Sequence, residues 1–159
     1  MMIFLIGFMG SGKTYLGKKA ASELKLSFYD LDNEIEKKTG LSISKIFENK
    51  GERYFREIES EILLNWDKPG IIATGGGVIE MEKNRNFLKK QKTIWLDVDW
   101  ETIYSRIEKS KRPLVKQLTK NDLFTLYDKR INKYRICANN TYNSNEINLS
   151  LFIKHCFEI

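Results

Sequence analysis

Gly7-Phe8-Met9-Gly10-Ser11-Gly12-Lys13-Thr14 is the stretch of this sequence that decides its fold class. It follows the spacing G-x-x-x-x-G-K-[ST], in which glycines let the backbone turn tightly and aim successive N–H groups inward. An apolar run over 3–6 precedes it, and a helical pattern over 13–25 follows it. We therefore predict a phosphate-binding loop, with Lys13 reaching the terminal phosphates of a nucleotide and the Thr14 hydroxyl holding Mg²⁺. An ordinary glycine-rich turn is the alternative.

Apolar strands alternate with helical patterns along the rest of the chain. The expected strands cover 3–6, 27–29, 71–74 and 93–96, with a weak fifth near 141–142. The expected later helices cover about 32–38, 42–49, 52–66, 81–90, 100–108, 119–137 and 146–157. Continuous apolar strands between helices indicate a parallel sheet covered on both faces. We predict a three-layer α/β/α fold in a single domain spanning 1–159.

Length and composition exclude several classes of protein. A chain of 159 residues that is 42% hydrophobic and 30% charged is neither disordered, collagen-like nor a coiled coil. The early apolar run over 1–9 is too short to span a bilayer and lacks the basic start of a secretory signal. Cys137 and Cys156 are too few for a disulfide framework, so we expect a cytoplasmic protein. A lone histidine, His155, argues against a histidine metal site or a Ser-His triad.

The positive charge is concentrated between residues 105 and 135. The net charge is +6, and this segment holds ten basic residues against three acidic ones, which favours an anionic partner. Within it, KSKRPLVKQLTK (109–120) has poor helical period and is expected to be a loop of functional length. Such a loop could close as a lid and bring Arg112 to a transferring phosphate. A solvated basic loop is the alternative, which we prefer for Lys109, Lys111, Lys116 and Lys120.

A carboxylate pair, Asp30-Leu31-Asp32, follows the second expected strand. Alternation along an extended segment puts both carboxylates on one side, at the end of the strand where ligands bind in parallel sheets. One could serve the metal, directly or through water, and the other could accept a proton from a substrate hydroxyl. The alternative is that Asp32 only caps the next helix.

Three glycines, Gly75-Gly76-Gly77, follow the third expected strand. Close approach of the backbone to a ligand would explain them, and a tight strand-to-helix turn is the alternative.

Two arginines lie on amphipathic helices. Arg56 could bind a ligand or pair on the surface with Glu52 or Glu59.

Arg130 shares the apolar face of a helix that starts with a capping-box pattern at Thr119 and Asp122. A charge on that face needs a partner, because burying an unpaired charge is costly. A ligand carboxylate bound by both guanidinium amino groups would suit it. An internal ion pair with a buried Asp or Glu is the alternative.

Together these motifs resemble the shikimate kinase family. The matching segments are GFMGSGKT (7–14), Asp30-Leu31-Asp32, Gly51-Glu52-Arg53-Tyr54-Phe55-Arg56-Glu57-Ile58-Glu59, Gly75 to Gly77, Arg112-Pro113-Leu114, and Leu126 through Arg130 to Tyr134. Their order and spacing agree from residue 2 to about residue 138. The resemblance implies a fold like that of nucleoside monophosphate kinases: a five-stranded parallel sheet, a lid over about 109–120 and a helical substrate-binding region over about 32–60.

The resemblance also implies an activity and a role for each motif. ATP with Mg²⁺ would phosphorylate the 3-hydroxyl of shikimate to give shikimate 3-phosphate and ADP, on the route to chorismate and aromatic amino acids. The implied nucleotide-binding residues are Gly10, Ser11, Gly12, Lys13, Thr14, Tyr15 and Arg112, with Thr14 on the metal and Asp30 near it. The implied substrate-binding residues are Asp32 as candidate base, Arg56 and Arg130 on the carboxylate, and Gly75, Gly76 and Gly77, with Phe47, Phe55 and Glu59 supporting the pocket. Lys13, Asp32 and Arg112 form the implied catalytic set.

The chain departs from the family pattern in two places. No second lid arginine can be assigned, although Arg106 is a weak candidate whose alternative is a place on the helix surface. Members often carry an arginine near the adenine after the last strand, where this chain has Asn143-Ser144-Asn145-Glu146. Two other functions stay open: a kinase of another small hydroxy acid such as gluconate, and a non-catalytic nucleotide- or RNA-binding module. We expect a monomer that binds neither nucleic acid nor a membrane.

Overall fold

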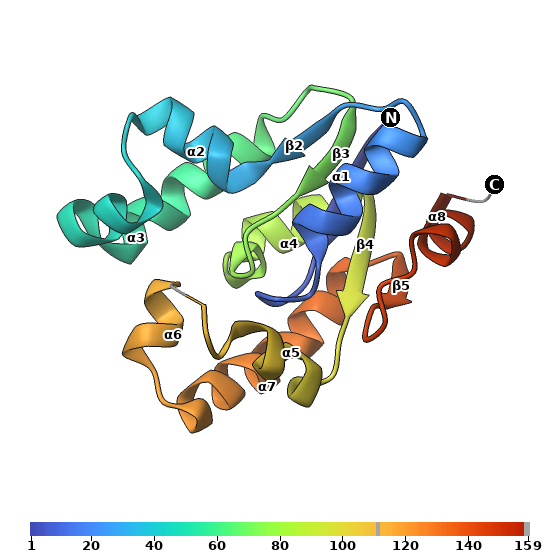
Figure 1. Ribbon diagram of the computed structural model, residues 1–159. Helices are drawn as coiled ribbons and strands as arrows, with labels where there is room; N and C mark the ends of the chain where they lie inside the picture. Colours follow the sequence, from blue (N-terminus) through green and yellow to red (C-terminus); the bar gives the residue numbers. More distant parts are fainter. Residues whose placement is uncertain (111, 158–159) are drawn as a thin grey trace.

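The computed structural model describes residues 1–110 and 112–157 and contains a five-stranded, all-parallel sheet of strand order β2-β3-β1-β4-β5 (Figure 1). The strands are β1 Met2–Ile6, β2 Phe28–Asp30, β3 Gly70–Ala73, β4 Lys92–Asp97 and β5 Asn140–Asn143. The helices are α1 Lys13–Glu23, α2 Leu31–Thr39, α3 Ile43–Leu64, the 3₁₀ turn η1 Val78–Glu80, α4 Glu82–Leu88, α5 Trp100–Ile107, α6 Pro113–Gln117, α7 Lys120–Cys137 and α8 Leu149–Phe157. The predicted parallel α/β fold is confirmed, including its weak fifth strand.

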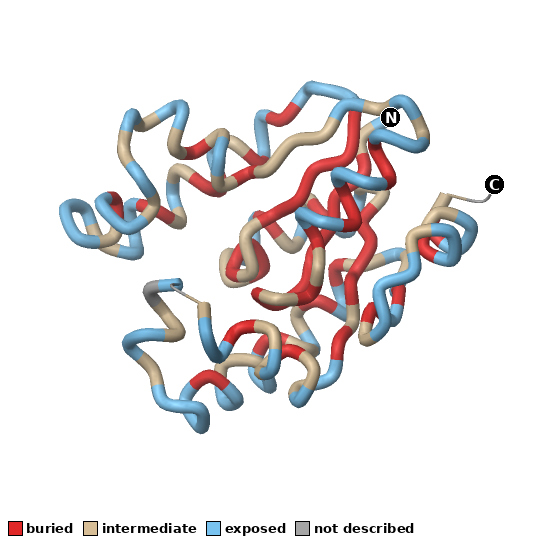
Figure 2. Tube along the Cα trace, in the orientation of Figure 1, coloured by how far each residue is buried: buried red, intermediate tan, exposed pale blue. Residues whose placement is uncertain are grey.

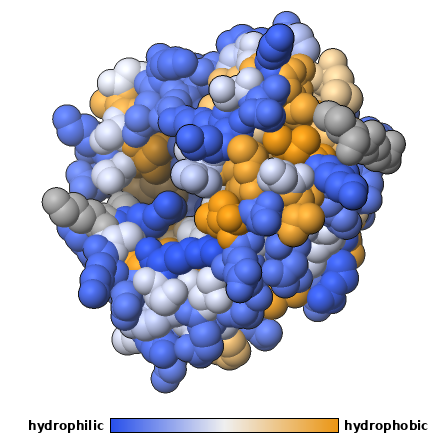
Figure 3. Space-filling model, turned by 45° about the vertical axis from the view of Figure 1, so that its right-hand side comes forward, coloured by the Kyte–Doolittle hydropathy of each residue, from blue (hydrophilic) through white to orange (hydrophobic). Residues whose placement is uncertain are grey.

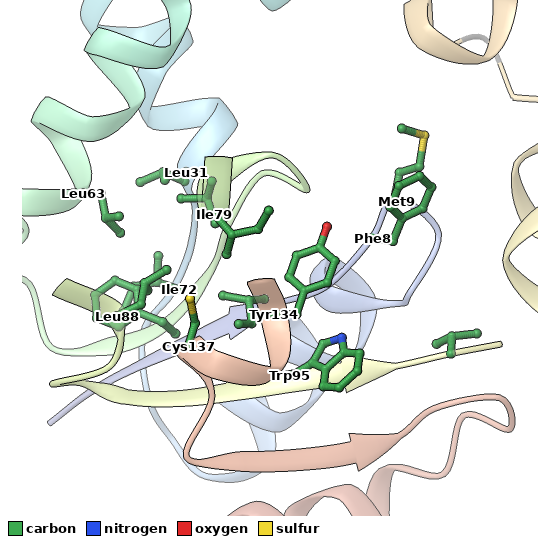
Figure 4. Packing of buried hydrophobic residues seen from close by; sticks show 14 of the residues in the cluster. Phe8, Met9, Leu31, Leu63, Ile72, Ile79, Leu88, Trp95, Tyr134 and Cys137 are labelled. Carbon is green, nitrogen blue, oxygen red and sulfur yellow. The ribbon is translucent and has the colours of Figure 1, made fainter. Parts of the chain in front are cut away.

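Helices cover both faces of the sheet, which explains why the central strands β3, β1 and β4 are buried along most of their length, whereas the edge strands β2 and β5 are only partly buried (Figure 2). Successive side chains of β1 point to opposite faces. Ile3 and Leu5 belong to the core under α1 and α8, whereas Phe4 and Ile6 belong to the larger core on the other face. That larger core includes residues of α3, α4, α5 and α7, and Figure 4 shows Tyr134 of α7 close to Trp95 of β4 within it. Burying one large apolar side chain completely stabilises the folded state by about 1.5–3 kcal/mol relative to leaving it exposed.

The helices differ from expectation in two segments. The expected helices over 42–49 and 52–66 run together as α3, with a break at Gly51, where φ is +81°. Glycine permits this left-handed geometry at little cost, so the chain turns there and continues. The expected loop over 109–120 contains the short helix α6, with Arg112 as its N-cap residue and Pro113 in its first turn. Proline favours a first turn because its fixed φ suits a helix and its missing N–H is not needed there. Lys111, within the expected lid, lies outside the described residues.

Three motifs meet at one edge of the sheet because the strands are parallel. The phosphate loop, residues 7–14, follows β1, the carboxylate pair ends β2, and the three glycines follow β3. Strand register places Ala73 beside both Leu5 and Asp30, so the three strand ends are adjacent. This edge is where ligands bind in open parallel sheets.

The surface on the face in Figure 3 is largely hydrophilic, with an area of hydrophobic side chains toward its centre and right. Within residues 1–110 and 112–157, no helix combines the length and the apolar character needed to cross a membrane.

Candidate active site

The phosphate loop has the conformation that its glycines predict. Gly10 and Gly12 adopt positive φ angles of +80° and +93°, which side chains with a β-carbon rarely accept. Lys13 at the start of α1 is only 8% exposed, and its Nζ donates hydrogen bonds to Gly7 O at 2.7 Å and Phe8 O at 3.0 Å. Burial lowers the pKa of Lys13 to about 7, and the positive charge of Arg112 acts in the same direction. The ammonium group is therefore held inside the loop.

Asp30 connects the phosphate loop to the second strand. Its Oδ2 accepts a hydrogen bond from the Thr14 hydroxyl at 3.0 Å, and its Oδ1 accepts one from the Asp32 backbone N–H at 3.1 Å. The second contact makes Asp30 the N-cap of α2. The alternative considered for Asp32 is therefore wrong about the residue: the capping role belongs to Asp30, which leaves the Asp32 side chain free for another role.

Asp32 carries a buried oxygen without a partner. Its Oδ1 has no hydrogen-bond partner among the described residues. Burial raises the pKa of Asp32, and the nearby Asp30 carboxylate raises it further. The cations Lys13, Arg112 and Arg56 oppose this shift. An unpaired polar atom in a protein interior is costly and calls for a functional explanation.

Glu59 presents a second orphan oxygen beside the first. The carboxyl group is fully buried, and its Oε1 finds no partner among the described residues. A β-carbon added to Gly75 would lie 2.8 Å from this Oε1 and 3.1 Å from Asp32 Oδ1. Both oxygens therefore border the same glycine. Burial raises the pKa of Glu59 to about 7, against the opposing charge of Arg56.

Arg56 lies over the glycine loop, residues 75–77, and forms ion pairs with residues of its own helix. Its NH1 group donates to Glu59 Oε2 at 2.7 Å, and its Nε contacts the exposed Glu52 at 3.4 Å. Arg56 thus pairs with both Glu52 and Glu59, the two carboxylates named in the alternative, but the Glu59 pair is buried rather than on the surface. The guanidinium also lies 5.1 Å from the centre of the Phe55 ring. Phe55 packs on Phe47, with ring centres 4.8 Å apart, in the small core between α2 and α3.

Arg130 approaches the glycine loop from α7, which starts with the predicted capping box. The residue is 4% exposed, and its Nε donates to Glu80 Oε1 at 2.7 Å. The internal ion pair considered as the alternative is therefore present, with a partly exposed carboxylate that also accepts from Lys133. One helical turn later, the Tyr134 hydroxyl donates to Gly76 O. The guanidinium lies 5.8 Å from the ring centre of Phe8 in the phosphate loop.

The remaining predicted residues lie toward the edges of this site. Arg112 is exposed at the start of α6, and its charge reaches both Lys13 and Asp32, because it affects the pKa of each. Tyr15 is 55% exposed on α1, with Lys19 6.0 Å from its ring centre. No contact between Tyr15 and the site is found in the described part of the chain.

Sequence reasoning missed Glu80 and the hydroxyl contact of Tyr134. Glu80 ends η1, three residues after the last glycine, and pairs with a residue fifty positions away. Only the fold brings these residues together, so no local pattern could identify Glu80. Tyr134 shares the apolar face of Arg130, which predicted its burial but not its contact with Gly76.

Gly77→Ala is expected to lower the free energy of unfolding by about 1–3 kcal/mol, because the added β-carbon would push the Arg56 guanidinium away from the buried Glu59 carboxylate. A β-carbon there would lie 2.6 Å from Cζ of Arg56, while the φ of −97° suits alanine. Urea denaturation measures the loss. In an Arg56→Ala background the same change should cost little, because the overlapping atoms are gone. Equal costs in both backgrounds would contradict the close approach.

The parallel fold and the phosphate loop define this chain as a P-loop nucleotide-binding protein, with carboxylates and arginines gathered beside the phosphate loop. The family model for shikimate kinase matches residues 9–158. Shikimate kinase of Staphylococcus aureus is 46% identical over 151 residues, which cover 93% of this chain and 87% of the relative. The chain belongs to the shikimate kinase family.

Solved structures agree with this assignment. Shikimate kinase from Acinetobacter baumannii, in complex with shikimate, superposes with a TM-score of 0.83 at 39% identity, covering 92% of this chain and 83% of that one. Shikimate kinase from Bacteroides thetaiotaomicron superposes with a TM-score of 0.87 at 29% identity, covering 100% of this chain and 99% of that one.

Proposed function

We propose that this chain transfers the γ-phosphoryl group of ATP to the 3-hydroxyl of shikimate, giving shikimate 3-phosphate and ADP on the route to chorismate. One observation carries the proposal: the glycine loop 75–77 lies against Asp32, Glu59 and Arg56 and is bound by Tyr134, one helical turn after Arg130. Gly75 borders Asp32 and Glu59, Gly77 borders Arg56, and Gly76 O accepts a hydrogen bond from the Tyr134 hydroxyl. The phosphate loop adjoins this cluster, because a β-carbon on Gly76 would lie 3.3 Å from Met9 N.

The chemistry divides between two halves of the site. In the substrate half, Arg56 and Arg130 bind the carboxylate of shikimate, and the backbone of Gly75, Gly76 and Gly77 lines the ring. Asp32, whose Oδ1 lacks a protein partner, accepts a hydrogen bond from the reacting hydroxyl and takes its proton. Phosphoryl transfer depends mainly on positioning and on neutralising charge, and Lys13 and Arg112 supply the positive charge.

Nucleotide binding uses the backbone amides of the phosphate loop and the start of α1. Its proposed residues are Gly10, Ser11, Gly12, Lys13, Thr14, Tyr15 and Arg112. Thr14 Oγ1 and Asp30 Oδ2, which lie 3.0 Å apart beside the loop, fit Mg²⁺, since this ion prefers oxygen ligands and is commonly held by one or two protein groups plus phosphates. Bound there, directly or through water, Mg²⁺ would neutralise charge on the phosphates.

A coupled assay of ADP release tests the proposal, with shikimate and gluconate as separate acceptors. Turnover that requires shikimate, with phosphate on its 3-hydroxyl, is the expected result. Turnover on gluconate alone would overturn the proposal, since Arg56 and Arg130 could hold that carboxylate as well. ATP binding without turnover on either acceptor would favour a non-catalytic nucleotide-binding module.

Arg130→Ala is expected to weaken shikimate binding by about 2–5 kcal/mol, because a buried guanidinium would no longer meet the carboxylate. Titration calorimetry with shikimate measures the loss, and ATP affinity should change little. Lys133→Ala is the matched control, since it removes the other cation that Glu80 binds and leaves the guanidinium in place. A folded Arg130→Ala variant with unchanged shikimate affinity would assign Arg130 to the Glu80 ion pair alone.

Several expectations stay predictions. They are the single domain over 1–159 with a substrate-binding region over about 32–60 and a lid over about 109–120, the cytoplasmic location, the monomeric state and the lack of nucleic-acid binding.

A further inference from the structure

Arg106 of α5 binds main-chain carbonyls from two separate loops. Its NH1 group donates to Gly10 O of the phosphate loop at 3.0 Å. Its NH2 group donates to Ser144 O at 2.9 Å and Asn145 O at 2.8 Å, in the post-β5 loop, residues 144–148. The guanidinium thus joins two segments more than a hundred residues apart and is not free as a lid arginine.

Ser144 makes a second connection between the same loops. Its hydroxyl donates to Ser11 O at 2.9 Å, and the residue is fully buried. Its backbone N–H donates to Asp97 O at 2.9 Å, which fixes Ser144 to the end of β4. In addition, Ile147 Cδ1 would lie 3.5 Å from a β-carbon on Gly12. The post-β5 loop is therefore packed along the outside of the phosphate loop.

These contacts set the direction of the phosphate loop's amides. In a trans peptide the C=O of one residue and the N–H of the next point in opposite directions. Arg106 holds Gly10 O and Ser144 holds Ser11 O, two successive carbonyls of the loop. Their peptide partners, the N–H groups of Ser11 and Gly12, are thereby turned away from the post-β5 loop. The Ser11 N–H donates to Phe8 O at 3.2 Å inside the phosphate loop, so a bound phosphate would compete with that carbonyl for it. An anion cradle of this kind works through amides held in advance in one orientation.

We propose that Arg106 and Ser144 form a carbonyl clamp that orients the phosphate loop, so that affinity for the phosphate chain of a nucleotide depends on two residues that do not touch it. They are positioning residues. The inference rests on the proposed function in that a nucleotide binds the loop. It also gives the Asn143–Glu146 segment a task other than contact with the base.

The test measures binding of two probes, Mg²⁺-ATP and inorganic tripolyphosphate with Mg²⁺, by titration calorimetry. Arg106→Lys keeps the positive charge, but an ammonium cannot span three carbonyls as a planar guanidinium does. We expect it to weaken both probes by about tenfold. Ser144→Ala removes one hydrogen bond and should weaken both by about fivefold. Shikimate affinity, measured in parallel, should stay within about twofold in each variant.

Asn139→Ala is the matched control. The Asn139 side chain also joins two distant segments through their main-chain groups: it accepts a hydrogen bond from Thr93 N at 2.7 Å and donates one to Gln91 O at 2.6 Å. These contacts lie at the opposite end of β4 from the phosphate loop. It should leave the affinity for both probes unchanged, which separates the clamp from a general loss of stability. If Arg106→Lys does not fold, Ser144→Ala decides by itself.

The possible outcomes separate the inference from the function on which it rests. Wild-type affinity for tripolyphosphate in both variants would overturn the clamp. Weaker ATP with unchanged tripolyphosphate would overturn it too, because Arg106 would then act on the nucleoside. A wild-type protein that binds ATP but not tripolyphosphate would also overturn the clamp, since the phosphate loop would then not supply the affinity for ATP. A wild-type protein that binds no ATP would instead refute the proposed function.

Discussion

Asp32→Asn is expected to lower kcat by about 10²–10⁴-fold, the usual contribution of a general base. Asparagine keeps the shape of the side chain and can still contact a hydroxyl, but it cannot take its proton. The N-cap of α2 is left intact, because Asp30 and the Asp32 backbone supply it. Steady-state kinetics with shikimate and ATP measure the loss. ATP affinity should stay nearly unchanged, since the ATP contacts lie in the phosphate loop.

The matched control for this change is Asp122→Asn. Asp122 is also an aspartate in the first turn of a helix, where it accepts hydrogen bonds from Thr119 in the capping box of α7. Its replacement should lower stability slightly, by weakening the capping box, without a comparable loss of kcat. Near-normal turnover in Asp32→Asn would remove Asp32 from the chemical step.

Lys13→Ala is expected to reduce turnover by at least about 10³-fold in a protein that still folds. The ammonium group is the only positive charge placed inside the phosphate loop among the described residues, where it is bound by Gly7 O and Phe8 O. A cation aimed at the transferring phosphoryl group in a water-poor site is worth about 10³–10⁵ in kcat in related chemistry. The coupled ADP assay measures turnover, and circular dichroism establishes folding.

Lys19→Ala, an exposed lysine on the same helix, is the control for loss of positive charge and should keep normal kinetics. Shikimate binding to Lys13→Ala should stay close to that of the wild type, because the substrate half is built from α2, α3, α7 and the glycine loop. Turnover of the Lys13→Ala variant at the wild-type rate would contradict the role assigned to Lys13 in the phosphate loop.

Local patterns in the sequence determined most of the fold and the composition of the site. The loop over 7–14 could be identified because its glycines and lysine act within eight consecutive residues. The central strands could be identified because both faces of a parallel sheet are covered, which buries most of their side chains and favours apolar residues. The capping box of α7 was readable because its two partners, Thr119 and Asp122, lie three residues apart.

Tertiary structure decided which partner each charged group takes. Arg130 meets Glu80, and Arg106 meets Gly10 and Ser144, across separations that no periodicity encodes. Asp30, rather than Asp32, became the helix cap because backbone geometry selects between two similar carboxylates. The sequence alone determined most of the chemical groups that the site contains, since those follow from short-range spacing, whereas Glu80 was found only in the folded chain. Their pairing depends on long-range packing, because hydrogen bonds and burial require a distance and a direction that only the folded chain provides.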